Sequence, residues 1–364
     1  MSDKKLTILG IIATILVFLA ALQSRYANKQ SFVPAGNFYL IQGLDTEKIA
    51  SIVLGTGDDQ VVLVRRGWAF LVVNRDDYPA DTGKINALIS SCLDLKTAEF
   101  VTDNPANHND LGVAVDKARY VVEFIDKDSQ PITGLVVSGP DPEIKKTFAR
   151  LISSDEVYSL LENPWFFSTA MDYIDKTIIK IERDNISSVT VTSPDGSYTL
   201  EGKEDRVVIE NMPEGKQFKG NDYKQVFSAL TNLQITDVKK ETSQSSELKF
   251  DTTYLCRLKD STVYTLAIAV QDDKAYFRCN AVFTDKTTVT KDRSVESEEE
   301  LKKKEAKLVA RDNAQSFSQK HAGWIYEVNK IQADNMTKAL LDILEDVREE
   351  KSEETASVPE PAGS

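Results

Sequence analysis

Two histidines head the short set of residues in this chain that could do chemistry. His108 and His321 are the only histidines, and each lies in a polar stretch. Neither belongs to an H-E-x-x-H or G-x-S-x-G pattern, the motifs of zinc proteases and α/β-hydrolases. Both are therefore predicted to be surface residues, and neither is assigned as a general base or a metal ligand.

Two pairs of neighbouring aspartates could supply the carboxylates that acid and base catalysis needs. They are Asp76 with Asp77, and Asp272 with Asp273. Each pair stands at the end of a predicted strand, where aspartate is a common turn former. They are predicted to form turns, and no catalytic residue is assigned.

Two other stretches partly match ligand-binding loops. Residues 196–203 are spaced like a phosphate loop, but five residues separate the glycines and Glu204 stands where Ser or Thr would bind magnesium. Residues 126–128 begin like a calcium loop, but Pro131 occupies the position of its glycine. The first is predicted to be a strand and the second a β-turn, so no cofactor or metal site is expected.

Three tryptophans could line a binding surface. Trp68 and Trp324 begin apolar strands, which predicts that both pack in the core. Trp165 stands beside Phe166 and Phe167, between two similar halves of the chain. This cluster either holds the halves together or forms an exposed contact patch. It is the candidate interaction patch of the sequence.

The three cysteines lack the C-x-x-C spacing of metal and redox sites. Cys256 and Cys279 fall on the first and third strands of a predicted meander, about 10 Å apart, which is beyond disulfide reach. Together with Cys92 they are predicted to be free and mostly buried.

The composition limits the classes of partner. The chain has 364 residues, 41% of them hydrophobic, and a net charge of −13. This charge disfavours nucleic acid as a partner and disfavours tight docking of the whole body on anionic lipid. The length after the first apolar stretch suffices for two domains.

That apolar stretch, residues 6–22, contains no charge, and with Gln23 it approaches the roughly 20 residues that cross a bilayer. A cleaved signal peptide is the alternative, but no good cleavage site follows, so retention is favoured. The prediction is a cytoplasmic tail at residues 1–5, a transmembrane helix at residues 6–23 and a translocated body behind a stalk at residues 24–44.

The body reads as one module repeated. Residues 49–54 are echoed by residues 186–191, and in each half short β-branched runs precede a helical pattern. Asp81 is placed to cap the first of these helices. The modules are predicted at residues 45–165 and 166–348.

Charged and acidic segments complete the expected organisation. The second module contains a charged helical insertion at residues 297–320, with Glu and Lys four residues apart. A last helix carries an apolar stripe from Met336 to Val347, and residues 349–364 form a disordered acidic tail. The predicted fold class is α+β: a single N-terminal transmembrane helix followed by two tandem β-meander-plus-helix modules, the second with this insertion.

Short marks along the first half of the body resemble a bacterial family catalogued as domain of unknown function 4340. They are the Trp68 strand, Tyr78-Pro79-Ala80-Asp81 before a helix, the strand after Leu95, Leu111-Gly112, and Phe148-Ala149-Arg150 followed by Asp155-Glu156-Val157-Tyr158. The resemblance covers roughly residues 44–240. The chain departs from the pattern at Val113-Ala114, where a proline is common, and in the insertion.

The resemblance implies a membrane-anchored accessory protein encoded beside ABC-type export systems like those linked to gliding motility. It implies a place in the bacterial inner membrane, a periplasmic body, and permease and ATPase subunits as partners, and it brings no catalytic residues. The leading hypothesis is therefore a non-enzymatic accessory or scaffold component. An envelope module that binds a glycan or peptide is the alternative, and an envelope hydrolase dependent on Asp76 or Asp77 comes third.

Overall fold

A computed structural model describes residues 37–347 except 144, 205, 243–246 and 290–296. These residues are mostly β-sheet, arranged in three antiparallel sheets with four α-helices. The α+β class predicted from the sequence is therefore wrong. Three of these helices have 12 residues or fewer, and the β-branched runs between them supply most of the ordered structure.

None of the helices in the described ranges is long and apolar enough to cross a membrane. The predicted cytoplasmic tail at 1–5, the transmembrane segment at 6–23 and the acidic tail at 349–364 lie outside the described residues. So do residues 24–36 of the predicted stalk. The rest of that stalk belongs to the folded body, because Leu40 and Ile41 are buried.

The described chain divides into two compact units. Unit 1 takes in residues 37–60 and 86–168, and unit 2 takes in residues 61–85 and 169–347.

The first nine-stranded sheet has the order β4-β3-β2-β1-β6-β7-β8-β9-β5. Its strands are β1 (Ser51–Leu54), β2 (Val61–Arg66), β3 (Ala69–Val72), β4 (Tyr78–Pro79), β5 (Thr97–Thr102), β6 (Tyr120–Ile125), β7 (Pro131–Val137), β8 (Phe148–Leu151) and β9 (Val157–Leu160).

The second nine-stranded sheet has the order β10-β15-β19-β18-β17-β16-β11-β12-β13. Its strands are β10 (Thr177–Ile179), β11 (Ile186–Ser193), β12 (Gly196–Lys203), β13 (Arg206–Ile209), β15 (Leu233–Lys240), β16 (Thr252–Leu258), β17 (Thr262–Gln271), β18 (Lys274–Phe283) and β19 (Trp324–Val328). The third sheet pairs β14 (Lys216–Phe218) with β20 (Leu344–Asp346).

Eight strands follow one another in the same order in both large sheets. β1, β2, β3 and β5 to β9 of the first sheet correspond to β11, β12, β13 and β15 to β19 of the second. A helix lies at the same point of the chain in each series, α2 (Thr82–Leu93) before β5 and α3 (Asp222–Phe227) before β15.

The start of α2 is fixed by Asp81. Its Oδ1 accepts hydrogen bonds from the backbone N–H groups of Gly83 at 2.7 Å and Lys84 at 3.2 Å. These N–H groups have no partner inside the helix, so the carboxylate satisfies them, as the sequence predicts.

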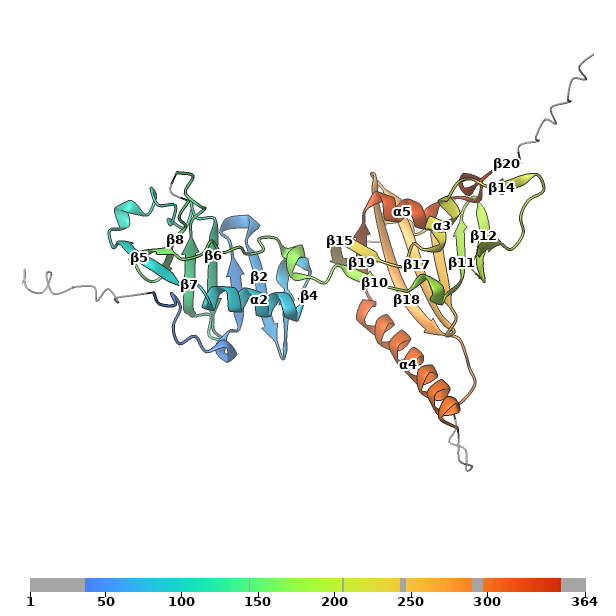
Figure 1. Ribbon diagram of the computed structural model, residues 1–364, viewed down its shortest axis with the longest axis horizontal. Helices are drawn as coiled ribbons and strands as arrows, with labels where there is room; N and C mark the ends of the chain where they lie inside the picture. Colours follow the sequence, from blue (N-terminus) through green and yellow to red (C-terminus); the bar gives the residue numbers. More distant parts are fainter. Residues whose placement is uncertain (1–36, 144, 205, 243–246, 290–296, 348–364) are drawn as a thin grey trace, which may run out of the picture. The chain divides into compact units, whose positions relative to one another are not determined.

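The charged insertion is the helix α4 (Glu298–His321), which lies beside β18 in Figure 1. Ser297 caps its first turn in a reciprocal pair of hydrogen bonds with Glu300. Near its other end the Ser318 hydroxyl accepts from the N–H of Ala281 and donates to the same residue's carbonyl. This end of α4 is therefore joined to β18.

The predicted last helix is wrong beyond Thr337. The chain forms α5 (Lys330–Thr337), then a short 3₁₀ turn (Leu340–Ile343), then the strand β20. Met336, Ile343 and Leu344 are all buried, as their spacing predicts. Leu344 pairs with Phe218 of β14, and this tertiary pairing overrides the helical pattern.

The cores are apolar and contain the cysteines. In unit 1 a cluster joins Val113, Val121, Val136, Phe148 and Val157. The three cysteines, Cys92, Cys256 and Cys279, are free and buried. Cys256 on β16 and Cys279 on β18 are separated by β17, as the sequence predicts.

Candidate functional site

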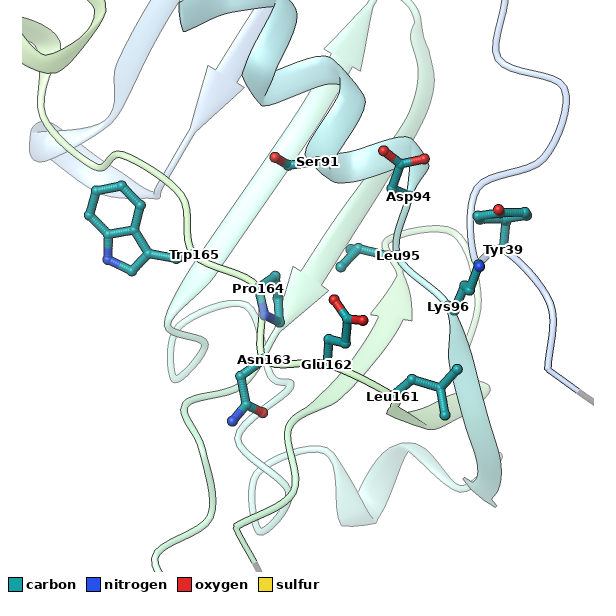
Figure 2. A pocket seen from close by; sticks show the side chains of 10 residues that line it. All are labelled: Tyr39, Ser91, Asp94, Leu95, Lys96, Leu161, Glu162, Asn163, Pro164 and Trp165. Carbon is teal, nitrogen blue, oxygen red and sulfur yellow. The ribbon is translucent and has the colours of Figure 1, made fainter.

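A pocket of about 380 Å³ opens on unit 1 (Figure 2). Two segments supply most of its wall: the chain that leaves α2 and the chain that leaves β9. Its lining residues are Tyr39, Ser91, Asp94, Leu95, Lys96, Leu161, Glu162, Asn163, Pro164 and Trp165.

Main-chain hydrogen bonds hold these segments side by side. Tyr39 and Lys96 form an antiparallel bridge, and the N–H of Leu40 donates to the carbonyl of Leu95 at 2.9 Å. The N–H of Leu161 donates to the carbonyl of Lys96 at 3.0 Å. The walls of the pocket are therefore tied to the edge strand β5.

Three large apolar or aromatic side chains of the pocket reach solvent. Trp165 is 61% exposed, Leu161 48% and Tyr39 45%. The ammonium group of Lys96 lies 5.0 Å from the centre of the Tyr39 ring, in a cation–π contact. Aromatic side chains that are partly exposed to solvent are typical of surfaces that bind other molecules.

The polar groups of the pocket carry mixed charge. In Figure 2 the side chains of Asp94 and Glu162 lie between Trp165 at one end and Tyr39 at the other. The side chain of Asn163 is held in place by Thr147, whose hydroxyl donates a hydrogen bond to its Oδ1 at 2.6 Å. The pocket thus offers apolar contact at its ends and hydrogen bonding between them, which suits recognition of a polypeptide or a polar ligand.

The sequence-predicted patch divides between the surface and the core. Trp165 lines the pocket, and its ring meets that of Phe167 edge-on at 4.6 Å. Phe166 is only 4% exposed and packs edge-on against Tyr120 at 5.1 Å. Whether the patch binds a partner stays a prediction, in which Trp165 is the contact residue and Phe166 its support.

The prediction that the histidines lie at the surface is wrong. His108 is buried, and its Nε2 lies 3.1 Å from the carbonyl oxygen of Asp155. This contact joins the polar loop that contains His108 to Asp155, and no pattern in the sequence predicted it. Its polar neighbours in the sequence face solvent while the ring turns inward.

His321 is buried in unit 2 at the end of α4. Its Nδ1 lies 2.6 Å from the hydroxyl of Tyr326, which in turn lies 3.5 Å from the hydroxyl of Tyr78. Burial, together with the charge of Lys320, lowers the pKa of His321 to about 4. Burial raises the pKa of Tyr326, so its hydroxyl keeps its proton and donates to the neutral imidazole.

The paired aspartates form turns, as predicted. Asp76, Asp77, Asp272 and Asp273 all have φ between 51° and 62°, in the left-handed region that Asp tolerates. The carboxylate of Asp76 accepts a hydrogen bond from the N–H of Lys240 at 2.8 Å.

The two remaining tryptophans differ from each other. Trp324 is half-buried and packs edge-on against Tyr78 at 4.8 Å. Trp68 is 104% exposed, so the prediction that it packs in the core is wrong. Phe70 and Val72 are in phase with it and are buried, but Trp68 stands in the turn before β3 begins.

Arg150 has a structural role that the sequence did not indicate. It is 7% exposed, and its guanidinium donates to the carbonyls of Val113, Leu151, Ile152 and Ser154 at 2.9 to 3.3 Å. Burial lowers its pKa, and Asp155 opposes this shift. In the sequence, Arg150 was singled out only as part of the Phe148-Ala149-Arg150 motif, one of those that resemble the family.

Metal-binding and reactive-thiol chemistry find no support among the described residues. They contain no cluster of three or more His, Cys, Asp or Glu side chains that could hold a metal ion. Burial raises the pKa of Cys256 and of Cys279 to about 12, so both stay protonated thiols.

Comparison with known proteins places the chain in a family. No curated protein and no solved structure matches it. A family described as "Domain of unknown function (DUF4340)" matches residues 68–253, about half of the chain and parts of both units. The chain belongs to the family described as Domain of unknown function (DUF4340).

Proposed function

We propose that this protein is a non-enzymatic accessory component of an ABC-type transport system in the bacterial inner membrane. The apolar stretch at residues 6–23 anchors it there, and its folded body lies on the periplasmic side. The body gives the permease and ATPase assembly a docking platform.

The observation that carries this proposal is the pocket face of unit 1. Trp165, Leu161 and Tyr39 expose apolar surface around a pocket whose backbone is tied to the sheet. A rigid aromatic anchor within a polar rim is how protein interfaces concentrate their binding energy. Membership in the family supports the same direction, through the resemblance to accessory proteins of export systems.

The test is purification of the tagged full-length chain from native membranes in a mild detergent. We expect the ATPase and permease subunits to be recovered with it. A variant with Trp165→Ala and Leu161→Ala should lose most of this recovery, because both exposed contacts are removed. Recovery of the unaltered chain without these subunits contradicts the proposal.

A matched control separates the pocket from the rest of the surface. Ile331 of α5 is 75% exposed, so Ile331→Ala removes a similarly exposed apolar side chain in unit 2. It should leave the recovery unchanged. Equal loss in both variants would assign the effect to general surface chemistry.

The pocket also favours a second function, a module that captures a glycan or peptide in the envelope. Its volume suits a small ligand, and it combines two aromatic side chains with Asp94, Glu162 and Asn163. A rise in melting temperature with peptidoglycan fragments or short peptides, abolished by Trp165→Ala, would favour this function.

A further inference from the structure

The turn between β2 and β3 places a fully exposed tryptophan beside two arginines. Trp68 is the most exposed large hydrophobic side chain in the described part of the chain, at 104%. Gly67 has a φ of 63° and lets the hairpin turn. Arg65 and Arg66 precede it, and we refer to Arg65, Arg66 and Trp68 as the hairpin tip.

Folding does not explain Trp68. Its side chain is as open to water as in an extended chain, so it contributes no packing. Shortening such a side chain should leave the stability of the fold nearly unchanged. The tryptophan is therefore available for contact with something outside the fold.

The chemistry of the hairpin tip matches the headgroup region of a bilayer. Tryptophan prefers this region because its ring is apolar and its N–H finds polar partners there. The guanidinium of the half-buried Arg65 lies 4.9 Å from the centre of the Phe70 ring. Arg66 forms an exposed salt bridge to Asp77 at 3.4 Å, and such a bridge contributes little. A lipid phosphate can replace Asp77 as its partner, in bidentate geometry.

The length of the chain places a bilayer within reach. This step rests on the proposed membrane location. The apolar stretch ends near residue 23 and the described body begins at residue 37. The 14 residues from one to the other span at most about 50 Å when fully extended. The anchor thus raises the local concentration of lipid around the whole chain.

We propose that the hairpin tip is a second membrane contact, in which Trp68 enters the headgroup layer and Arg65 and Arg66 bind anionic lipid phosphates. The net charge of −13 opposes adsorption of the whole body. The contact therefore depends on the anchor, which supplies a high local concentration of lipid. It fixes the orientation of the hairpin toward the membrane.

The experiment uses the full chain reconstituted into phosphatidylcholine vesicles with or without phosphatidylglycerol. The chain has three tryptophans, so Trp165→Phe with Trp324→Phe leaves Trp68 as the only reporter. When the phosphatidylcholine carries brominated acyl chains, Trp68 should lose about half of its emission, as expected for an interfacial ring. Arg65→Gln with Arg66→Gln should weaken this quenching chiefly in vesicles that contain phosphatidylglycerol.

A second reporter is the control. Trp68→Phe with Trp324→Phe leaves Trp165, which is exposed but lies outside the hairpin tip. Its emission should not be quenched by the brominated lipid. Equal quenching of both tryptophans contradicts a contact made by this hairpin.

The remaining outcomes separate this inference from the proposed location. A chain that floats with the vesicles while Trp68 stays unquenched overturns the hairpin contact and leaves the anchor intact. A chain that does not float with the vesicles overturns the membrane location and the hairpin contact with it. Protection of Trp68 by an added protein, without lipid quenching, assigns the hairpin tip to a protein partner and overturns the inference.

Discussion

The guanidinium of Arg150 lies inside unit 1 and satisfies four main-chain carbonyls around the loop that follows β8. A buried carbonyl without a partner costs free energy, so this one side chain stabilises the loop by pairing its carbonyls. Val113, whose carbonyl is one of the four, belongs to the apolar cluster of the unit. Arg150 thus links this loop to the core.

Arg150→Met should lower the free energy of unfolding by about 2 to 4 kcal/mol, because it leaves buried carbonyls unpaired. Urea denaturation followed by circular dichroism measures this loss. Arg257→Met is the matched control, since Arg257 is exposed on β16. A loss no larger than that of the control would show that the hydrogen bonds of Arg150 do not stabilise the fold.

His321 makes stability depend on pH. Its pKa is about 4 in the folded protein against an ordinary value of 6.5. Below pH 6.5 the imidazole of His321 becomes protonated in the unfolded chain. In the folded protein it stays neutral until the pH falls to about 4. The free energy of unfolding should therefore fall as the pH falls through this window, by about 3 kcal/mol in total.

His321→Gln keeps a hydrogen-bonding side chain but removes the titration. The difference in unfolding free energy between the unaltered protein and this variant should shrink steadily from pH 7 to pH 4. Chemical denaturation at several pH values measures it. A difference that is constant across this range would contradict a buried, neutral imidazole.

At the scale of the elements, α2 depends on its first turn. Asp81→Ala removes the acceptor for the N–H groups of Gly83 and Lys84 and should cost about 1 kcal/mol. Asp81→Asn keeps an acceptor and should cost little. Melting temperatures of the two variants distinguish these cases, and equal values would rule out a capping role.

The sequence predicted those elements whose signals are local. The cap and apolar spacing of α2, the charged helical pattern of α4 and the turn aspartates depend on neighbours within a few residues. They therefore stand where the pattern put them. The echo of residues 49–54 in residues 186–191 likewise corresponds to β1 and β11 of the two sheets.

What the sequence could not predict depends on distant partners. The stripe after Met336 leaves the helix because β14 pairs with Leu344, a contact across more than a hundred residues. Trp68 continues the alternation of Phe70 and Val72, yet β3 begins only at Ala69, so Trp68 lies in the turn and is exposed. His108 turns inward to a carbonyl that its own neighbours do not supply. The same limit applied to the pocket, since Tyr39 and Trp165 lie far apart in the sequence.

At the scale of the whole molecule, the two large sheets repeat one order of eight strands, and their surfaces differ. Unit 1 carries the pocket with Trp165, while the second sheet carries the charged helix α4. A repeated framework with unlike surfaces suits a platform that meets more than one partner, which is the role we propose for this chain.

The most direct test of this role is photo-crosslinking in intact cells of the native host. A benzophenone amino acid replaces Trp165 in the pocket, or Ile331 on α5 as the control position. We predict that position 165 crosslinks to a permease subunit of an ABC-type transporter and that position 331 does not. Crosslinks from position 165 that contain no transporter subunit, or equal yields from both positions, would contradict the account.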